Sequence, residues 1–185
     1  VKSAVRVPVT LKMRLGRGGA SLNASEFGRI AEDAGLSMLV VHGRTRRQMY
    51  NGEADWQKIS AVVDAVSIPV IVNGDIRCAD TAMQAMVASG AAGVMVGRGA
   101  QGRPWLLAQI GDVIAGRKMR VTPSIRTRHE LLRAHLDDMI TYYGSAAMRL
   151  ARKHISWYAY GLPGAAELRD IANNTTDPET VFAAV

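Results

Sequence analysis

The chain has almost no cysteine and no long apolar stretch, the two features that identify disulfide-rich and membrane proteins from sequence. Of its 185 residues only Cys78 is a cysteine, so an internal disulfide framework is excluded, and a lone thiol fits a reducing cytoplasm. No stretch approaches the 18 or more consecutive apolar residues of a membrane-spanning helix. We therefore expect a cytoplasmic protein with no membrane partner. With 48% hydrophobic residues, the chain is able to bury a core.

Two kinds of site also lack their usual sequence signals. The histidines show no metal-ligand spacing and no Cys/His cluster occurs, so we expect no metal. His135 lies on the apolar stripe of a predicted helix and is expected in the core. No phosphate-binding loop is recognised after the first apolar run, which disfavours an open sheet of the flavodoxin type. The four histidines are His42, His129, His135 and His154.

A short apolar run that ends in a polar or glycine-bearing tip recurs four times. The runs are 9–16, 38–46, 68–76 and 93–100. Runs of this kind are typical of strands buried on both faces, and the carboxyl ends of such strands carry chemistry. We expect the four tips to build one site. The candidate residues at these tips are Lys12, His42, Asn73, Gly74, Asp75, Gly97 and Arg98.

The spacing of the runs predicts βα units and a parallel sheet. Each interval is wide enough for one strand, one helix and two short loops. Helices are predicted at 25–34, with Ser25 as a cap, at 55–65 and at 80–88. Four units make half of a (β/α)8 barrel, so we expect the C-terminal half of a TIM barrel over residues 1–116 of a longer protein. A complete four-unit open sheet is the alternative.

The pattern changes after residue 116. Residues 117–123 read as a polar linker that ends in Pro123, and residues 124–185 read as a small all-α helical domain. Positive charge is concentrated here: residues 117–154 hold nine Lys and Arg against three Asp and Glu, within a chain of net charge +7. A localised basic surface favours a polyanionic partner, although a solvated helix face is the simpler alternative.

Candidate RNA contacts occur in both parts of the chain. On a helix, Arg149, Lys153 and Trp157 advance in steps of four, so two cations and an aromatic ring share roughly one face. Cations can bind phosphates while a ring stacks on an exposed base. Arg44 and Arg46 are expected to extend outward on the loop after the second run. The predicted RNA-binding residues are Arg44, Arg46, Arg149, Arg152, Lys153, His154 and Trp157.

In combination, these motifs resemble the second half of a tRNA-dihydrouridine synthase, most closely of the bacterial B-type subfamily. The resemblance rests on LKMRLG, on VHGRTR with its downstream Tyr50, Gly52 and Asp55-Trp56, on IPVIVNGDI, on VGRGAQGRPWL and on RKHISWY. It implies FMN at the mouth of the barrel, NADPH as the reductant, and reduction of the C5–C6 bond of selected uridines in tRNA. A full-length monomer is expected.

The resemblance implies roles for individual residues. Lys12 would stabilise the reduced flavin, whose negative charge lies near N1 and C2=O. His42 would hydrogen-bond the flavin edge or the base, and Asn73 and Asp75 the ribityl chain or their own loop. Backbone amides at Gly74, Gly97 and Gly99 would form a phosphate cradle with Arg98.

No catalytic residue is expected in this chain. The family's acid is a cysteine in an Asn-x-x-Cys-Pro type loop after the fourth strand, and no such loop occurs here. Cys78 is followed by Ala79 and Asp80, so it reads as a packing or loop cysteine, and the fragment alone is expected to be inactive. Two alternatives stay open: another FMN-binding barrel oxidoreductase that acts on a small pyrimidine, and an RNA-binding fragment without activity.

Overall fold

The computed structural model describes residues 2–185, and Val1, the first residue of the predicted barrel segment, lies outside this range. The chain forms two compact units. The first, here called the sheet unit, contains the residues up to Gly99 together with Val113–Arg117; the second, the helical unit, contains Ala100–Asp112 together with Lys118–Val185. Residues 100–112 thus group with the helices, and the domain boundaries at residues 116 and 124 stay predictions.

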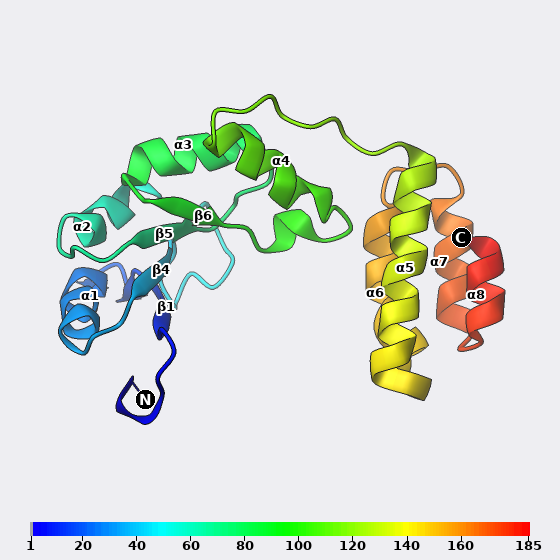
Figure 1. The fold of residues 1–185 in the computed structure, drawn as a ribbon, viewed down its shortest axis with the longest axis horizontal. Helices are drawn as coiled ribbons and strands as arrows, with labels where there is room; N and C mark the ends of the chain where they lie inside the picture. The colour runs from blue at the N-terminus through cyan, green and yellow to red at the C-terminus, as the bar shows by residue number, and fades with distance from the viewer. Residues whose placement is uncertain (1) are drawn as a thin grey trace. The chain divides into compact units, whose positions relative to one another are not determined.

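A four-stranded parallel sheet forms the centre of the sheet unit (Figure 1). Each predicted run contains one strand, shorter than the run itself. The strands follow one another across the sheet in chain order, without the reversal that defines a doubly wound open sheet, so the open-sheet alternative gains no support. The predicted α/β class with a parallel sheet is confirmed. The strands are β1 (Thr10–Arg14), β4 (Met38–His42), β5 (Val70–Asn73) and β6 (Gly93–Met95).

Helices lie between the strands in chain order, at the positions that the spacing predicts. They are α1 (Ala24–Asp33), the short pair η2 (Gln57–Ile59) and α2 (Ser60–Val63), and α3 (Ala79–Ser89). Tight packing fixes α1, because a Cβ on Gly28 would lie 3.2 Å from Val66 and 3.3 Å from Leu39 of β4. The expectation that Ser25 caps α1 is wrong. Asn23 is the N-cap residue, and the Ser25 hydroxyl donates instead to the Ala61 carbonyl at 2.9 Å.

Three kinds of local structure are not predicted by the sequence. A small antiparallel hairpin, β2 (Gly16–Gly18) and β3 (Ser21–Leu22), follows β1. Two single 3-10 turns occur at η1 (Lys2–Ala4) and η3 (Arg98–Ala100), and the helix α4 (Trp105–Ile114) follows the tip of β6. The glycines and polar residues of the hairpin show neither strand nor helix periodicity, so the sequence does not predict it.

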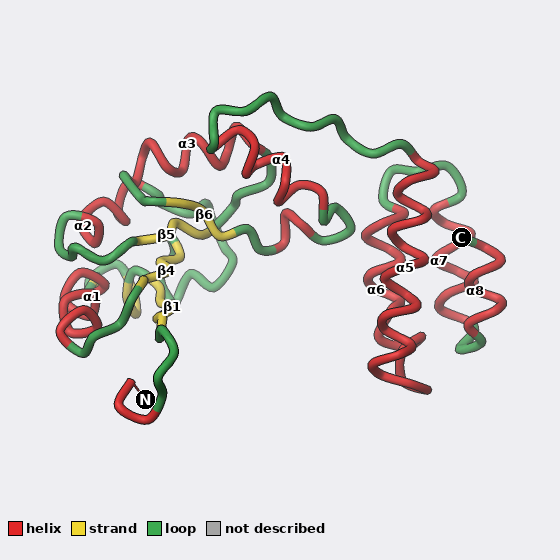
Figure 2. Tube along the Cα trace, viewed as in Figure 1, coloured by secondary structure: helices red, strands yellow, loops and turns green. Residues whose placement is uncertain are grey.

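Residues 124–185, predicted to be all-α, contain helices and no strands, and the helices are shown in red in Figure 2. They are α5 (Ile125–Tyr143), η4 (Gly144–Ala146), α6 (Ala147–Ala159), α7 (Ala165–Asn174) and α8 (Pro178–Ala184). Leu132, Leu136 and Met139 of α5 pack against Ala151 and Ile155 of α6 in a shared core. His135, expected in the core, is only half-buried at its edge, where its ring contacts those of His154 and Tyr158.

The segment predicted as a linker is tied to α4. Arg120 donates to both carboxylate oxygens of the buried Asp112, at 2.7 and 3.0 Å. Gln109 donates from its side-chain amide to the Arg120 carbonyl and to the Thr122 hydroxyl, each at 3.2 Å. These bonds hold the second half of α4 to residues 120–122 within the helical unit.

Neither a membrane segment nor a metal cluster is found among residues 2–185. None of the helices in this range is both long enough and apolar enough to cross a membrane. No group of three or more His, Cys, Asp or Glu side chains in the same range is arranged to hold a metal ion.

Candidate functional site at the carboxyl edge of the sheet

Polar side chains form a row across the carboxyl ends of the strands. The register places Arg14 opposite His42, His42 opposite Asn73, and Asn73 opposite Met95. Because side chains alternate along a strand, Lys12 lies on the same face of the sheet as Arg14. The opposite face carries the apolar residues, such as Leu39, that pack against the helices. One face of the sheet is therefore polar at its carboxyl edge, as expected of a site.

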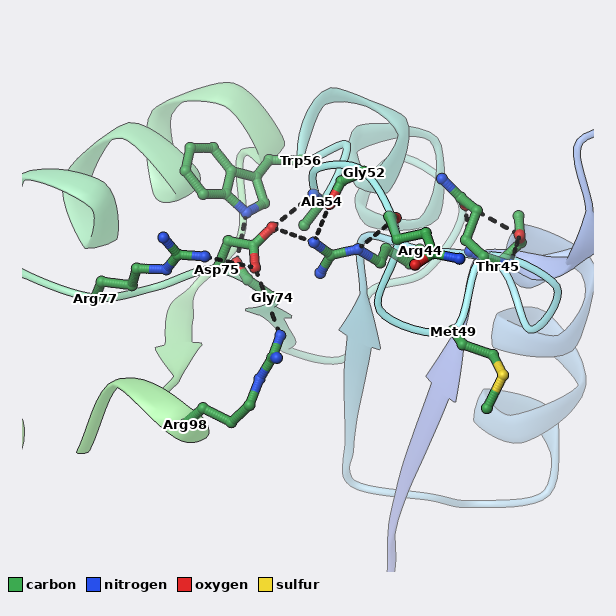
Figure 3. A network of polar contacts seen from close by, with 12 residues as sticks. Arg44, Thr45, Met49, Gly52, Ala54, Trp56, Gly74, Asp75, Arg77 and Arg98 are labelled. Carbon is green, nitrogen blue, oxygen red and sulfur yellow. Dashed lines mark hydrogen bonds and ion pairs between the residues drawn. The ribbon is translucent and has the colours of Figure 1, made fainter. Parts of the chain in front are cut away.

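The tips after β4 and β5 are joined by a buried ion pair (Figure 3). The Arg44 guanidinium donates to Asp75 Oδ2 at 2.6 Å and also to the carbonyls of Asn51 and Gly52. The expectation that Arg44 extends outward is wrong, because only 2% of its side chain is exposed. Its Nε and Nη2 atoms donate to protein acceptors, whereas the buried Nη1 has no hydrogen-bond partner among the described residues, so Arg44 organises the loop. Arg46, in contrast, is exposed as expected.

The Asp75 carboxylate accepts hydrogen bonds from two segments at this edge and has two further cations nearby. Besides Arg44, the Ala54 amide donates to Oδ2 at 2.8 Å, while Arg77 and Arg98 lie 3.8 and 3.9 Å from Oδ1. Burial raises the pKa of the Asp75 carboxyl, but the hydrogen bonds from Ala54 and Arg44 and the charge of Arg44 outweigh it, and the net pKa is lowered. Asp75 also has a positive φ of 54°, an uncommon conformation for a residue with a side chain.

Gly74 is required by packing. With φ at 116°, its Cβ would lie 2.7 Å from that of Ala54 and 3.5 Å from the His42 ring, and its carbonyl accepts from the Trp56 indole at 2.8 Å. A side chain at this position would push apart the loops that Asp75 joins. The space beside Gly74 is therefore filled by protein.

His42 is a buried neutral histidine. Its side chain is 8% exposed, and its Nδ1 has no hydrogen-bond partner among residues 2–185. Burial, followed by the charges of Arg14, Lys12 and Arg44, lowers its pKa to about 4. A neutral imidazole at pH 7 can donate from one ring nitrogen and accept at the other. His42 is thus suited to a polar ligand at this edge.

Lys12 and Arg14 bring positive charge to the same face. Lys12 is exposed in the described chain because β1 is the first strand of this sheet. The partial loss of water around its side chain, followed by the charge of Arg14, lowers the pKa of the Lys12 ammonium group. Arg14 donates from Nη1 to the carbonyls of Thr45 and Met49, at 3.0 and 2.8 Å. Two cations on one strand favour an anionic ligand.

The tip after β6 contains open space beside a cation. The buried Asn73 amide donates to the Met95 carbonyl at 2.7 Å and so joins β5 to β6. A Cβ on Gly97 would meet nothing within 4 Å, whereas one on Gly99 would lie 2.3 Å from the Ile76 carbonyl. Of the three glycines predicted to form a phosphate cradle, Gly97 is the one beside open space. Arg98, 59% exposed, lies next to it.

Sequence reasoning did not assign roles to Tyr50, Trp56 or Arg14. Tyr50 lies on the loop after β4, and the Arg98 guanidinium is 4.6 Å from the centre of its ring. In the sequence, Tyr50 is marked only as an aromatic residue in a loop that contains glycine and arginine and follows an apolar run. The contact itself joins residues 48 positions apart and depends on the fold.

The predicted RNA-binding residues of the helical unit differ in their surroundings. Arg149 and Lys153 are exposed on α6, and the Lys153 ammonium lies 6.0 Å from the centre of the Trp157 ring. Trp157 is half-buried, and its ring contacts His154 edge to face at 5.0 Å. Arg152 is half-buried and donates to the Ala172 carbonyl at 3.1 Å, which ties α6 to α7.

The sequence matches one protein family along its whole length. The family is described as "Dihydrouridine synthase (Dus)" and its match covers residues 1–185. The chain is 48% identical over 186 residues to a "Probable tRNA-dihydrouridine synthase" of Rhodobacter capsulatus, covering 100% of this chain and 57% of that protein. A protein of the same name from Rickettsia bellii is 46% identical over 179 residues, covering 96% of this chain and 55% of the relative.

The similarity extends to proteins named as the B-type enzyme. The "tRNA-dihydrouridine synthase B" of Pseudomonas syringae is 42% identical over 187 residues, covering 100% of this chain and 55% of its own length. The chain therefore spans about half the length of the curated relatives it matches.

Proposed function

Because the chain belongs to the dihydrouridine synthase family, we propose that it is the C-terminal portion of an FMN-dependent, NADPH-using enzyme that reduces selected uridines in tRNA to 5,6-dihydrouridine. The observation that carries the proposal is the row formed by Arg14, His42 and Asn73 at the carboxyl edge of a parallel sheet. In barrel enzymes this edge is where active sites lie. We propose that the four βα units form half of such a barrel.

The residues at this edge fit an anionic, planar cofactor. Lys12, Arg14 and Arg98 supply more positive charge than Asp75 neutralises, and the open side of Gly97 leaves room beside Arg98. The unpartnered Nδ1 of His42 can bind a polar ring atom. We propose that Lys12 and His42 face the flavin ring and that Gly97 and Arg98 bind the phosphate. Asn73, Gly74 and Asp75 hold these tips in place.

The chemistry divides between the cofactor and residues that position the substrate. Bound FMN would supply the hydride for one carbon of the uracil ring, and the neighbouring carbon requires a proton. His42, neutral at pH 7, is able to orient the base by hydrogen bonding. We propose that the proton donor is a cysteine outside this chain, so that residues 1–185 alone have no uridine-reducing activity.

The proposed substrate is a tRNA held by the helical unit. The exposed cations Arg149 and Lys153 on α6, together with Trp157, offer charge and an aromatic edge on one helix face. An oxidoreductase acting on a free pyrimidine has no use for such a face. This basic face, together with the relatives' names, favours tRNA over a small pyrimidine.

The test is made on the full-length protein. It should purify with bound FMN, and with NADPH it should produce dihydrouridine in tRNA isolated from a strain that lacks the modification, as measured by mass spectrometry. Lys12→Ala should lower flavin affinity or the rate of flavin reduction, because it removes a cation beside the ring. A colourless protein that stays colourless after soaking with FMN would refute the proposal.

A further inference from the structure

The side chain of Tyr50 lies against two guanidinium groups. The Cζ atom of Arg98 is 4.6 Å from the centre of the Tyr50 ring, and that of Arg14 is 5.8 Å away. Tyr50 remains 61% exposed, so burial of the ring does not account for its position. Contacts of this kind between an arginine and an aromatic face are attractive.

The loop that carries Tyr50 is held in an uncommon conformation. Met49, the preceding residue, has a positive φ of 49°. Residues other than glycine adopt this region rarely, and only where the surroundings enforce it. Arg14 supplies that enforcement, since its Nη1 donates to the Met49 carbonyl at 2.8 Å and to the Thr45 carbonyl at 3.0 Å. The backbone immediately before Tyr50 is therefore held by a side chain of β1.

Arg98 is consequently held from two sides. The Tyr50 ring lies against the guanidinium, and Asp75 Oδ1 lies 3.9 Å from its Nη2, too far for a hydrogen bond. A long side chain that is 59% exposed would otherwise sample many rotamers. The contact with Tyr50 restrains the Arg98 guanidinium on one side, while the 59% exposure of the side chain leaves its N–H groups accessible to an anion. That geometry suits a phosphate beside Gly97.

We propose that Tyr50 is a positioning residue that fixes Arg98 for binding the phosphate of the flavin cofactor. The inference rests on the proposed function. Beyond that function, we infer that the loop after β4, which carries Tyr50, raises the affinity of the tip after β6 for the FMN phosphate. Tyr50 acts through Arg98 and does not itself touch the phosphate.

The test compares two flavins that differ in the phosphate. Flavin is removed from the full-length protein, and FMN and riboflavin are titrated separately by fluorescence quenching. Tyr50→Ala should weaken FMN binding roughly two- to fivefold, the worth of an exposed contact of this type, and should leave riboflavin binding unchanged. Tyr50→Phe should retain wild-type affinity for both flavins, since a phenyl ring also attracts a guanidinium. Tyr160→Ala, which removes an 83% exposed tyrosine elsewhere, is the matched control.

The outcomes separate the possible roles. Equal weakening of FMN and riboflavin would overturn the inference, because it would show that Tyr50 supports the fold of the site in general. No change for either flavin would overturn it as well. In the Arg98→Ala background, Tyr50→Ala should cause no further loss of FMN affinity, and an additive loss would contradict action through Arg98. A wild-type protein that binds neither flavin refutes the proposed function itself.

Discussion

Arg44 and Asp75, 31 residues apart, form a 2.6 Å ion pair that joins the loops after β4 and β5. The Arg44 side chain is 2% exposed and that of Asp75 14%. Asp75 also accepts from the Ala54 amide, and so closes the loop between Arg44 and Ala54, which contains Tyr50. The pair therefore ties the two tips to each other, which is what a site assembled from separate loops requires.

Removal of the Asp75 charge should destabilise the protein strongly. Asp75→Ala leaves the Arg44 guanidinium buried and unpaired, which costs about 3–5 kcal/mol for pairs of this kind. The measurement is urea unfolding at pH 7. Asp64→Ala, which removes an exposed carboxylate next to α2, should change the unfolding free energy by less than about 0.5 kcal/mol. Equal small effects of the two substitutions would show that the pair contributes little.

His42 should make the protein less stable in mild acid. Its pKa of about 4 in the folded state lies below the ordinary value of 6.5, so the unfolded chain binds the proton more readily. The stabilisation is fully present above pH 6.5 and is lost as the pH falls from 6.5 to 4, up to about 3 kcal/mol.

The imidazole titration can be followed by NMR in the folded protein. The His42 signals should titrate with a midpoint near 4, and His42→Gln should flatten the unfolding free energy between pH 4 and 6.5. His154→Gln serves as the comparison. The pKa of His154 is also lowered, first by burial and then by the charge of His135, but its ring is only half-buried on α6. A His42 midpoint near 6.5 would contradict the prediction.

The sequence predicts the order of strands and helices well because apolar periodicity reports burial directly. Each of the four apolar runs contains a strand, and helices occupy most of the residues from 125 onward, which are predicted to be helical. Arg44 could not be placed in this way. Its position in a polar loop suggests exposure, and its burial depends on Asp75, an acceptor from another strand tip. Likewise, the contact between Tyr50 and Arg98 exists only once the tips have been brought together.

Gly102 should be one of the least replaceable residues of the helical unit. Its φ is 66°, and a Cβ there would lie 2.3 Å from the carbonyl carbon of Trp157 in α6. Gly102→Ala should cost about 2–4 kcal/mol, combining an unfavourable backbone conformation with overpacking. Gly116 has the same φ, but a Cβ there meets nothing within 4 Å. Gly116→Ala should therefore cost only about 1 kcal/mol. Thermal unfolding of both variants checks the difference.

Charge reversal on α6 should weaken tRNA binding by the full-length protein. Arg149→Glu combined with Lys153→Glu removes two exposed cations from one face, so the slope of log K against log salt should fall by about 1.5. The flavin content should not change. The control is Arg126→Glu combined with Arg169→Glu, the same change of net charge on α5 and α7, which should reduce the slope less. Mobility-shift assays across a salt series would decide, and identical slopes for both double variants would contradict the assignment to α6.

Cys78→Ser should leave turnover of the full-length enzyme within a few-fold of the wild type. Cys78 is exposed at the N-cap of α3, where its sulfur lies 3.5 Å from the Thr81 hydroxyl and its amide donates to that hydroxyl at 3.0 Å. Hydrogen bonds to the sulfur from the side chain and the backbone amide of Thr81 lower the pKa of the thiol, so the lowered pKa follows from capping and does not require a catalytic role. Serine is a preferred N-cap residue and should preserve the helix.

Two measurements distinguish a capping role for Cys78 from a catalytic one. Thr81→Ala removes the partner in the cap, so it should lower the unfolding free energy by about 1 kcal/mol while the rate of dihydrouridine formation stays near that of the wild type. Loss of a capping contact is expected to lower the unfolding free energy without lowering the rate of dihydrouridine formation. If Cys78→Ser instead lowers the rate a hundredfold or more, with folding and flavin content intact, then Cys78 is the proton donor. The chemistry that we propose to lie outside this chain would then lie within it.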